Sequence, residues 1–133
     1  LPLEEAPDAL AALDARGLAL VPLVAPTTPD SRLGDIGGRA RGFLYTVSVT
    51  GTTGEREGLA EGVDAVVSRA KSLTDVPVAV GFGISTPEQA ADTAAAGAEG
   101  VIIGSRLVRA AAESDDPAAA VGALVAGFAG ALR

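Results

Sequence analysis

The sequence predicts an α/β protein in which helices pack on a parallel sheet. Four short runs are apolar almost throughout, as expected of strands that are buried on both faces, and segments of helical character separate them. Apolar residues make up 48% of the 133 residues, but only one tyrosine and three phenylalanines are present. A core built mainly from Ala, Val, Leu and Ile suits helices that pack closely on such a sheet, and a chain of this length can bury one.

The elements follow one another in a regular order. The four predicted strands are Leu18–Ala25, Phe43–Val49, Val76–Phe82 and Gly100–Gly104. The six predicted helices are Glu4–Arg16, Pro29–Arg41, Ala60–Leu73, Pro87–Ala96, Arg106–Glu113 and Pro117–Leu132. Pro22 conflicts with a central place for the first strand, because proline has no N–H to donate to a ladder. One helix and four βα units indicate a parallel sheet with right-handed crossovers, either open or closed into an eight-stranded barrel.

Chain length and local signals refine this prediction. A (β/α)₈ barrel typically needs about 250 residues, so this chain would form about half of one. No linker divides it, and we therefore expect a single unit over residues 1–133. The clearest helix start is Thr86-Pro87-Glu88-Gln89, where Thr86 can cap, Pro87 suits the first helical position and Gln89 completes a capping box.

Composition excludes several functions. The net charge of −7 opposes nonspecific binding to nucleic acid or to an anionic membrane. Histidine, cysteine and methionine are absent, so disulfides, thiolate nucleophiles, an imidazole base and Cys/His metal sites are excluded. No apolar run is long enough to span a membrane, and the first residues lack the pattern of a signal peptide. We expect a cytoplasmic protein without a metal, a nucleic-acid partner or a membrane partner.

Glycines follow two neighbouring strands at the point where each opens into a helix. Gly81 and Gly83 end the third strand, and Gly104 and Ser105 end the fourth. Ligands of α/β proteins bind at this edge, and glycines let backbone N–H groups approach an anion closely. A lone Gly-x-Gly would be read as a tight turn, but its repetition one unit later predicts a phosphate site.

The connection Thr50–Gly58 is the third candidate feature, because its glycines and threonines are typical of a loop that closes over a substrate. Glu55 and Glu57 lie in it but flank Arg56, and they form no convincing acid–base pair. Ser105 lacks a partner histidine, so a binding role fits it better than nucleophilic catalysis. The residues therefore predict binding without a catalytic pair.

These residues resemble a known family, the tryptophan synthase alpha chain. The resemblance is carried by Gly42–Gly54, Pro77–Pro87 and Gly100–Ser105, in matching order and spacing, and extends over the whole chain. It implies a (β/α)₈ TIM barrel of the phosphate-binding type, of which this chain covers the last four βα units. The barrel would cleave indole-3-glycerol phosphate to indole and glyceraldehyde 3-phosphate in tryptophan biosynthesis.

The resemblance also implies roles for individual residues. Glycines and a serine would hold the phosphate, Phe82 would line the pocket, Tyr45 would face the substrate and Thr53 would anchor the lid. The implied substrate-binding set is Tyr45, Thr53, Gly54, Gly81, Phe82, Gly83, Gly104 and Ser105. Val49 replaces an arginine that is usual in the family, which affects one lid interaction.

The catalytic glutamate and the indole-binding aspartate of the family come from the second strand and the loop after it, outside this chain. We therefore expect a fragment that is inactive alone. The resemblance implies no cofactor here and a PLP-dependent beta chain as partner, in an α₂β₂ tetramer that receives the indole. Two alternatives remain open from the residues: a non-catalytic phosphate-binding half-barrel that self-associates, and another sugar-phosphate barrel enzyme.

Overall fold

The computed structural model describes residues 6–47, 63–81 and 83–133, which form six helices and four strands. In chain order they are α1 (Pro7–Asp14), β1 (Leu23–Val24), α2 (Asp30–Arg39), β2 (Leu44–Thr46), α3 (Val63–Lys71), β3 (Val78–Val80), α4 (Pro87–Ala95), β4 (Gly100–Val101), α5 (Ser105–Ala112) and α6 (Pro117–Ala131). The predicted order and type of these elements are confirmed.

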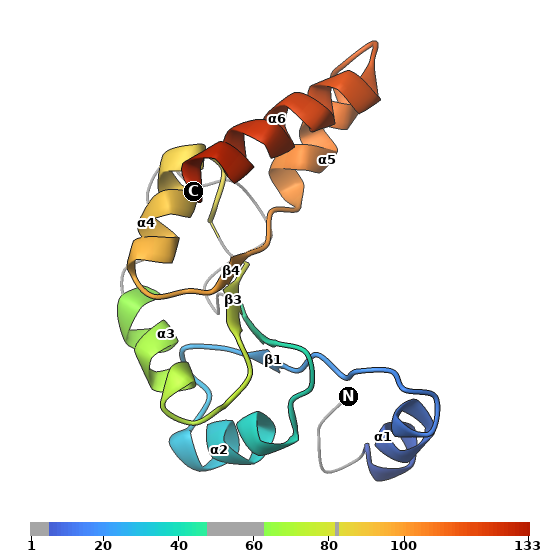
Figure 1. Ribbon diagram of the computed structural model, residues 1–133, viewed down its shortest axis with the longest axis vertical. Helices are drawn as coiled ribbons and strands as arrows, with labels where there is room; N and C mark the ends of the chain where they lie inside the picture. The colour runs from blue at the N-terminus through green and yellow to red at the C-terminus, as the bar shows by residue number, and fades with distance from the viewer. Residues whose placement is uncertain (1–5, 48–62, 82) are drawn as a thin grey trace.

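The four strands form one parallel sheet in the order β1-β2-β3-β4. Tyr45 on β2 lies opposite Leu23 on one side and Ala79 on the other. Figure 1 shows a crescent, in which α2, α3 and α4 lie along the convex side of the sheet and the α5–α6 pair extends from one end. The predicted α/β class with a parallel sheet is confirmed, and sequential neighbours in the sheet are the pattern of a barrel segment.

The strands are shorter than the sequence predicts, most of all β1, where Leu18–Ala25 was expected and only Leu23–Val24 is regular. Single ladder bonds continue beyond the regular parts: the Tyr45 N–H donates to the Pro22 carbonyl at 3.0 Å and the Val47 N–H donates to Val24 at 2.8 Å. Pro22 therefore precedes the strand and serves the sheet only through its carbonyl oxygen. The conflict over this proline disappears, because no N–H is required there.

Burial differs between the strands and between the two faces of one strand. All three residues of β3 are buried, whereas Leu18 and Leu23 are 54% and 60% exposed. The prediction that both faces of every strand are covered is therefore wrong for the first strand. The physical reason is that only one face of β1 is covered, because Val24 on the same strand is 2% exposed while Leu23 points to the opposite face.

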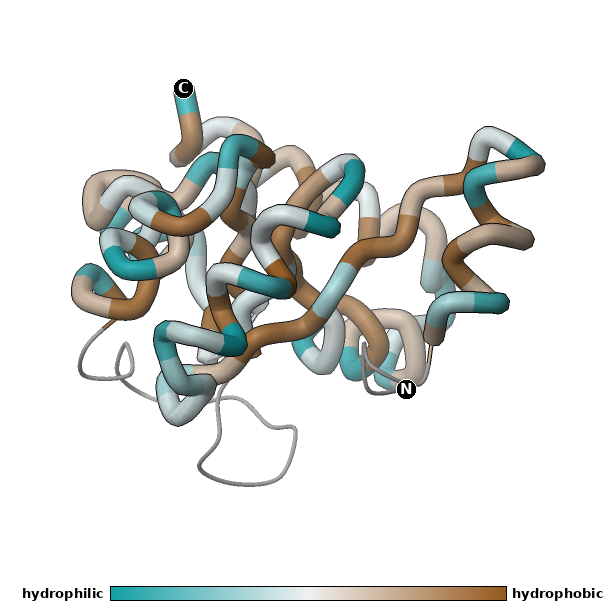
Figure 2. Tube along the Cα trace, turned by 90° about the horizontal axis from the view of Figure 1, so that it is seen from below, coloured by the Kyte–Doolittle hydropathy of each residue, from teal (hydrophilic) through white to brown (hydrophobic). Residues whose placement is uncertain are grey.

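Two hydrophobic clusters join the helices to the sheet. One surrounds Leu44 and Val78 and receives Leu33 and Ile36 from α2. The second, a cluster of residues from α3, β3, α4 and α6 and the turn after β3, consists of Val63, Val67, Val80, Ile84, Ala90 and Phe128. Figure 2 shows hydrophobic segments running through the middle of the molecule. The sheet is thus fixed against α2, α3 and α4, which positions its carboxyl edge.

The helix starts differ in how they are capped. At α4, the Thr86 hydroxyl accepts from the Gln89 N–H at 3.3 Å and the Gln89 side chain accepts in return, so the predicted capping box is confirmed. At α6, Oδ1 of Asp116 accepts from the Ala119 N–H at 3.1 Å. At α5 the N-cap residue is Gly104, and no side chain of the described residues caps the helix. Within the described part of the chain, no helix is long and apolar enough to span a membrane.

Candidate phosphate-binding site

The turn after β3 begins with Gly81, whose N–H donates to the Thr46 carbonyl at 3.1 Å. A Cβ built on Gly81 would lie within 3.0 Å of the Tyr45 ring atoms Cε2 and Cζ and of its hydroxyl oxygen. The ring of Tyr45 therefore packs directly on the backbone of Gly81. Because the Gly81 N–H is used in the sheet, this glycine contributes space at the site and not an N–H to an anion.

Gly83, two residues later, has a φ of +70°. A residue with a side chain in this left-handed region costs about 1–2 kcal/mol, so glycine is the natural residue at this point of the turn. The following residue, Ile84, is only 7% exposed and belongs to the cluster with Val80 and Phe128. The turn is thus sharply bent and fixed to the core on one side.

The turn after β4 is built differently. Gly104 is the N-cap of α5 with a φ of −112°, and a Cβ built on it would meet no heavy atom within 4 Å. Its carbonyl accepts from Leu107 and Val108, so the helix starts here, with Ser105 as its first residue. The first N–H groups of a helix have no partner within the helix, and the helix dipole makes this end favourable for an anion. Of the two turns, this one is therefore the stronger candidate for an anion site.

Both turns lie at the carboxyl edge of the sheet, because β3 and β4 are neighbouring parallel strands. The Ile102 N–H donates to the Val80 carbonyl at 2.8 Å just where the strands end. Tyr45 approaches from β2, through its contact with Gly81. The structure therefore gathers Tyr45 and the glycine turns at one edge. The other predicted site residues, Thr53, Gly54 and Phe82, lie outside the described residues, as do the predicted lid loop and its glutamates.

The sequence assigned Tyr45 and Gly81 to the site without relating them to each other. The register supplies the missing relation, since Tyr45 pairs with Ala79 and alternation puts Gly81 on the same face as Ala79. Gly100 continues that face, with a Cβ built on it lying 3.3 Å from the Ala79 Cβ. The sequence did contain a signal for this contact. Tyr45 is large, and the residues opposite it on the next two strands, Ala79 and Gly100, are small.

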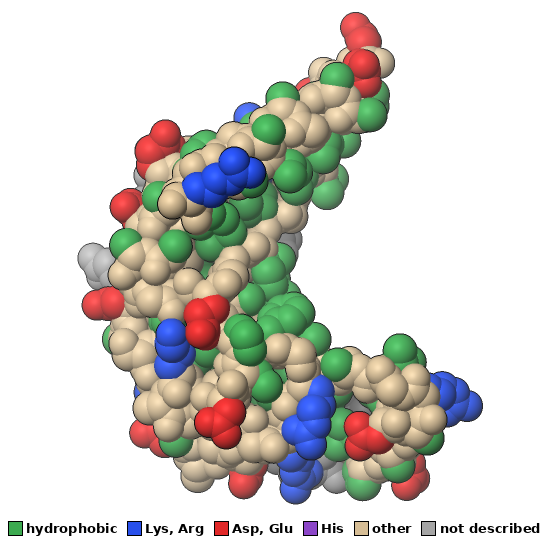
Figure 3. All heavy atoms as spheres, in the orientation of Figure 1, with side chains coloured by type: hydrophobic (Ala, Val, Ile, Leu, Met, Phe, Trp, Pro, Cys, Tyr) green, Lys and Arg blue, Asp and Glu red, His purple; other side chains and the backbone are tan. Residues whose placement is uncertain are grey.

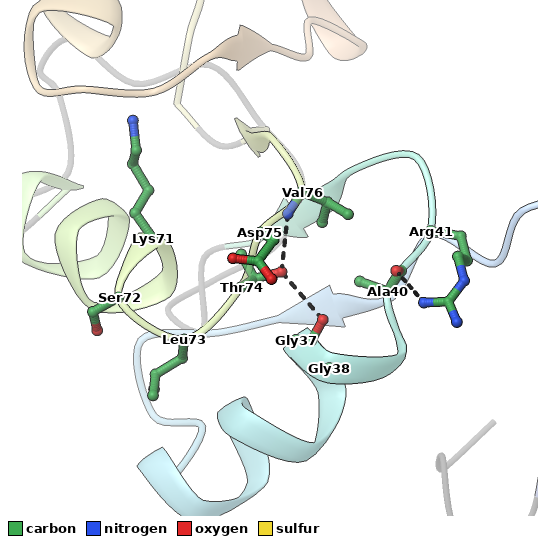
Figure 4. Close-up of a pocket in the computed structure, with 10 residues that line it drawn as sticks. All are labelled: Gly37, Gly38, Ala40, Arg41, Lys71, Ser72, Leu73, Thr74, Asp75 and Val76. Atoms are coloured by element: carbon green, nitrogen blue, oxygen red, sulfur yellow. Dashed lines mark hydrogen bonds between the residues drawn. The ribbon is translucent and has the colours of Figure 1, made fainter.

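A separate groove of about 370 Å³ lies at the amino ends of the strands, opposite the glycine turns. It is formed between the end of α2 and the α3–β3 connection (Figure 4). Within it the Thr74 hydroxyl donates to the Gly37 carbonyl at 3.2 Å. This groove adjoins the amino end of β3, and in parallel α/β folds that end serves stability, while ligands bind at the carboxyl end. No group of carboxylates that could hold a metal ion occurs among the described residues.

Comparison with known proteins agrees with the fold. The family profile described as tryptophan synthase alpha chain matches residues 1–130. The chain belongs to the tryptophan synthase alpha chain family. A curated alpha chain from Methanosarcina mazei is 50% identical over 116 residues, which are 87% of this chain and 42% of that relative. The alpha chain of Geobacter sulfurreducens is 45% identical over all 133 residues, or 49% of its own length.

Solved structures of the family superpose on the whole crescent. A tryptophan synthase structure from Mycobacterium tuberculosis gives a TM-score of 0.88 at 37% identity and covers 100% of this chain and 49% of its own. A mutant alpha-subunit from Pyrococcus furiosus gives 0.85 at 34% identity and covers 98% and 52%. The chain therefore spans about half the length of its relatives, and its four βα units form half of a (β/α)₈ TIM barrel.

Proposed function

We propose that this chain supplies the phosphate-binding half of an indole-3-glycerol phosphate lyase of tryptophan biosynthesis. One observation carries the proposal: two glycine turns end neighbouring parallel strands in a chain of the tryptophan synthase alpha chain family. The phosphate would lie between Gly83 and the start of α5, at Gly104 and Ser105. Tyr45 would face the rest of the substrate, and Thr53, Gly54 and Phe82 would complete the pocket.

The proposal separates binding from bond cleavage. Backbone N–H groups and a helix dipole hold a phosphate without moving protons. Cleavage to indole and glyceraldehyde 3-phosphate needs a general acid and base, which the proposal assigns to carboxylates in the other half of the barrel. Expected roles for this half are therefore to hold the substrate by its phosphate and to supply the loop that closes over it.

The partner of the proposed enzyme is a tryptophan synthase beta chain, in an α₂β₂ assembly located in the cytoplasm. One solved relative is described as a tryptophan synthase complex from Pyrococcus furiosus, which supports association of this kind. PLP chemistry would belong to the beta chain, and the residues of this half would bind no cofactor.

Phosphate binding can be tested on the chain as it is. Titration with glycerol 3-phosphate, followed by amide NMR, should give saturable shifts concentrated at residues 83–85 and 104–106. Glycerol, which lacks the phosphate, is the matched control ligand and should give none. Shifts that do not saturate, or that are spread evenly over the fold, would reject the site.

A second experiment tests whether binding and bond cleavage belong to different halves of the barrel. The pure chain should release no indole from indole-3-glycerol phosphate. Addition of an amino-terminal half taken from the Geobacter sulfurreducens relative, whose alignment leaves about half of its length unmatched, should restore turnover. Turnover by the pure chain would show that its own residues supply the acid and base.

A second candidate function is a self-associating, non-catalytic half-barrel. It is favoured by the sheet, in which β1 and β4 each have a single strand partner among the described residues. Figure 3 shows hydrophobic side chains along the inner side of the crescent. A two-fold axis along the strands would pair β4 of each copy with β1 of the other and keep all eight strands parallel. Light scattering that finds a stable monomer would exclude this arrangement.

A further inference from the structure

The side chain of Gln89 makes more bonds than its position in a helix cap requires. Its Oε1 accepts from the Ser85 N–H at 2.8 Å, from the Ser85 hydroxyl at 3.0 Å and from the Thr86 N–H at 3.2 Å. A capping box needs only the last of these. The two additional bonds hold Ser85, which lies outside the helix, in the turn that follows β3.

Those bonds fix the far end of the turn. Its near end is fixed by the ladder bond from Gly81 to Thr46, and its middle by the burial of Ile84. Gly83, which has a positive φ, lies in the chain between Gly81 and Ile84, two of these restrained residues. The side chain of Gln89 is itself nearly buried, since the residue is only 9% exposed, so solvent competes weakly for its oxygen.

The bonds also decide which amides of the turn are occupied. The N–H groups of Ser85 and Thr86 both point to one oxygen of Gln89, so they are committed inside the protein. A phosphate at this edge would therefore meet the earlier part of the turn, where Gly83 lies. The same bonds restrain Ser85 and Thr86, which follow directly on that part of the turn.

We infer that Gln89 is a positioning residue for the phosphate site, which acts by ordering residues 83–86 in advance of binding. A loop that is already ordered does not lose conformational freedom when the ligand binds, and affinity rises accordingly. This inference rests on the proposed function, because it requires that the turn meets a phosphate.

The competing explanation is that Gln89 only stabilises α4. The chain offers a matched control in Asp116, which caps α6 through Ala119, in another part of the fold. Asp116→Ala removes a helix cap without touching the turn after β3. Gln89→Glu is the conservative variant, since a glutamate oxygen can accept the same three hydrogen bonds.

The experiment measures three quantities for each variant of the full 133-residue chain. They are the dissociation constant for glycerol 3-phosphate by calorimetry, amide hydrogen exchange at Ser85 and Thr86, and the midpoint of urea unfolding. Gln89→Ala should weaken binding about tenfold and increase exchange at both amides. Gln89→Glu should stay within about threefold of the unchanged protein, with protection restored. Asp116→Ala should lower the urea midpoint and leave the affinity unchanged.

Each failure has a distinct signature. If the unchanged protein does not bind glycerol 3-phosphate, the proposed function fails and this inference fails with it. If the unchanged protein binds and Gln89→Ala binds equally well while losing stability like Asp116→Ala, the phosphate site stands and Gln89 is only a cap. Loss of binding in Gln89→Ala without faster exchange at Ser85 would also reject ordering as the cause.

Discussion

The two glycine turns that end β3 and β4 look alike in the sequence and differ in the structure. In the turn after β3, the protein's own side chains occupy the space and the N–H groups. Tyr45 packs on Gly81, and the Gln89 side chain accepts from the N–H groups of Ser85 and Thr86. In the turn after β4, a Cβ built on Gly104 would meet nothing within 4 Å, and no side chain of the described part of the chain caps α5.

The difference shows that glycine serves two purposes at one sheet edge. In the first turn, Gly81 is needed because the Tyr45 ring occupies the space of a side chain, and Gly83 is needed because its backbone lies in the left-handed region. In the second it leaves the start of a helix accessible. A hydrogen-bonded turn beside an accessible helix start is a suitable arrangement for an anion, because the bonds restrain the backbone and the helix start carries a partial positive charge.

The largest effect on phosphate affinity should come from capping α5, so that the turn after β4 resembles the turn after β3. Gly104→Asp would place a carboxylate at the N-cap of α5, where it competes with the ligand for the first N–H groups and repels its charge. Hydrogen bonds to charged groups contribute about 1.5–3 kcal/mol, so affinity for glycerol 3-phosphate should fall by roughly two orders of magnitude.

The matched control is Gly122→Asp, which adds the same charge in the middle of α6, at another position where a Cβ meets nothing within 4 Å. Calorimetry should show its affinity close to that of the unchanged protein. Equal losses in the two variants would mean that net charge, and not the start of α5, controls binding.

Gly81→Ala should be the next largest change, because the new methyl group and the Tyr45 ring cannot occupy the same space. Overpacking of this kind costs about 1–3 kcal/mol of unfolding free energy. Urea unfolding should show that Tyr45→Leu, made in the same protein, recovers part of the loss. Strictly additive effects of the two changes would contradict the contact, since residues that touch are expected to couple.

Gly83→Ala should cost about 1–2 kcal/mol of stability, because alanine is strained at a φ of +70°. It should also weaken phosphate binding severalfold by displacing the turn. Gly97, with a φ of +98° after α4, provides the control: Gly97→Ala carries similar strain away from the two turns. Thermal unfolding should fall in both variants, and calorimetry should detect weaker binding only in Gly83→Ala.

The smallest effect concerns Glu88 in the first turn of α4. Its own backbone N–H and the Thr86 hydroxyl hold the pKa of this exposed carboxyl below its usual value. A lowered pKa in the folded state stabilises the protein above the ordinary glutamate pKa of about 4.3, and this stability is lost as the pH falls through the folded value. The melting temperatures of the unchanged protein and Glu88→Gln should therefore differ slightly near neutral pH and converge in acid. Curves that stay parallel would exclude this contribution.

Much of the fold could be predicted from the sequence because its signals are local. The Thr86–Gln89 cap, the apolar run around Val78–Val80 and the order of the βα units depend on neighbouring residues only, and all were found. The exposure of Leu18 and Leu23 was missed, since burial depends on what covers each face of a strand and not on its composition. The length of β1 was overestimated because an apolar run does not show where the ladder bonds begin.

The candidate site was predicted in part. The sequence identified both glycine turns as one site, because the ends of neighbouring parallel strands meet at one edge. It treated the turns as equivalent, since the contact of Tyr45 with Gly81 and the bonds of Gln89 to Ser85 depend on side-chain directions in three dimensions. Whether the site binds phosphate stays a prediction.

The packing of Tyr45 against Gly81 has a practical consequence. The sequence contains no tryptophan and one tyrosine, so all the ultraviolet fluorescence excited above the phenylalanine band comes from this single ring. Its environment is the carboxyl edge of β2 and β3, beside the candidate site. The chain thus carries its own spectroscopic reporter, and an unlabelled sample in a fluorimeter can follow events at this edge in real time.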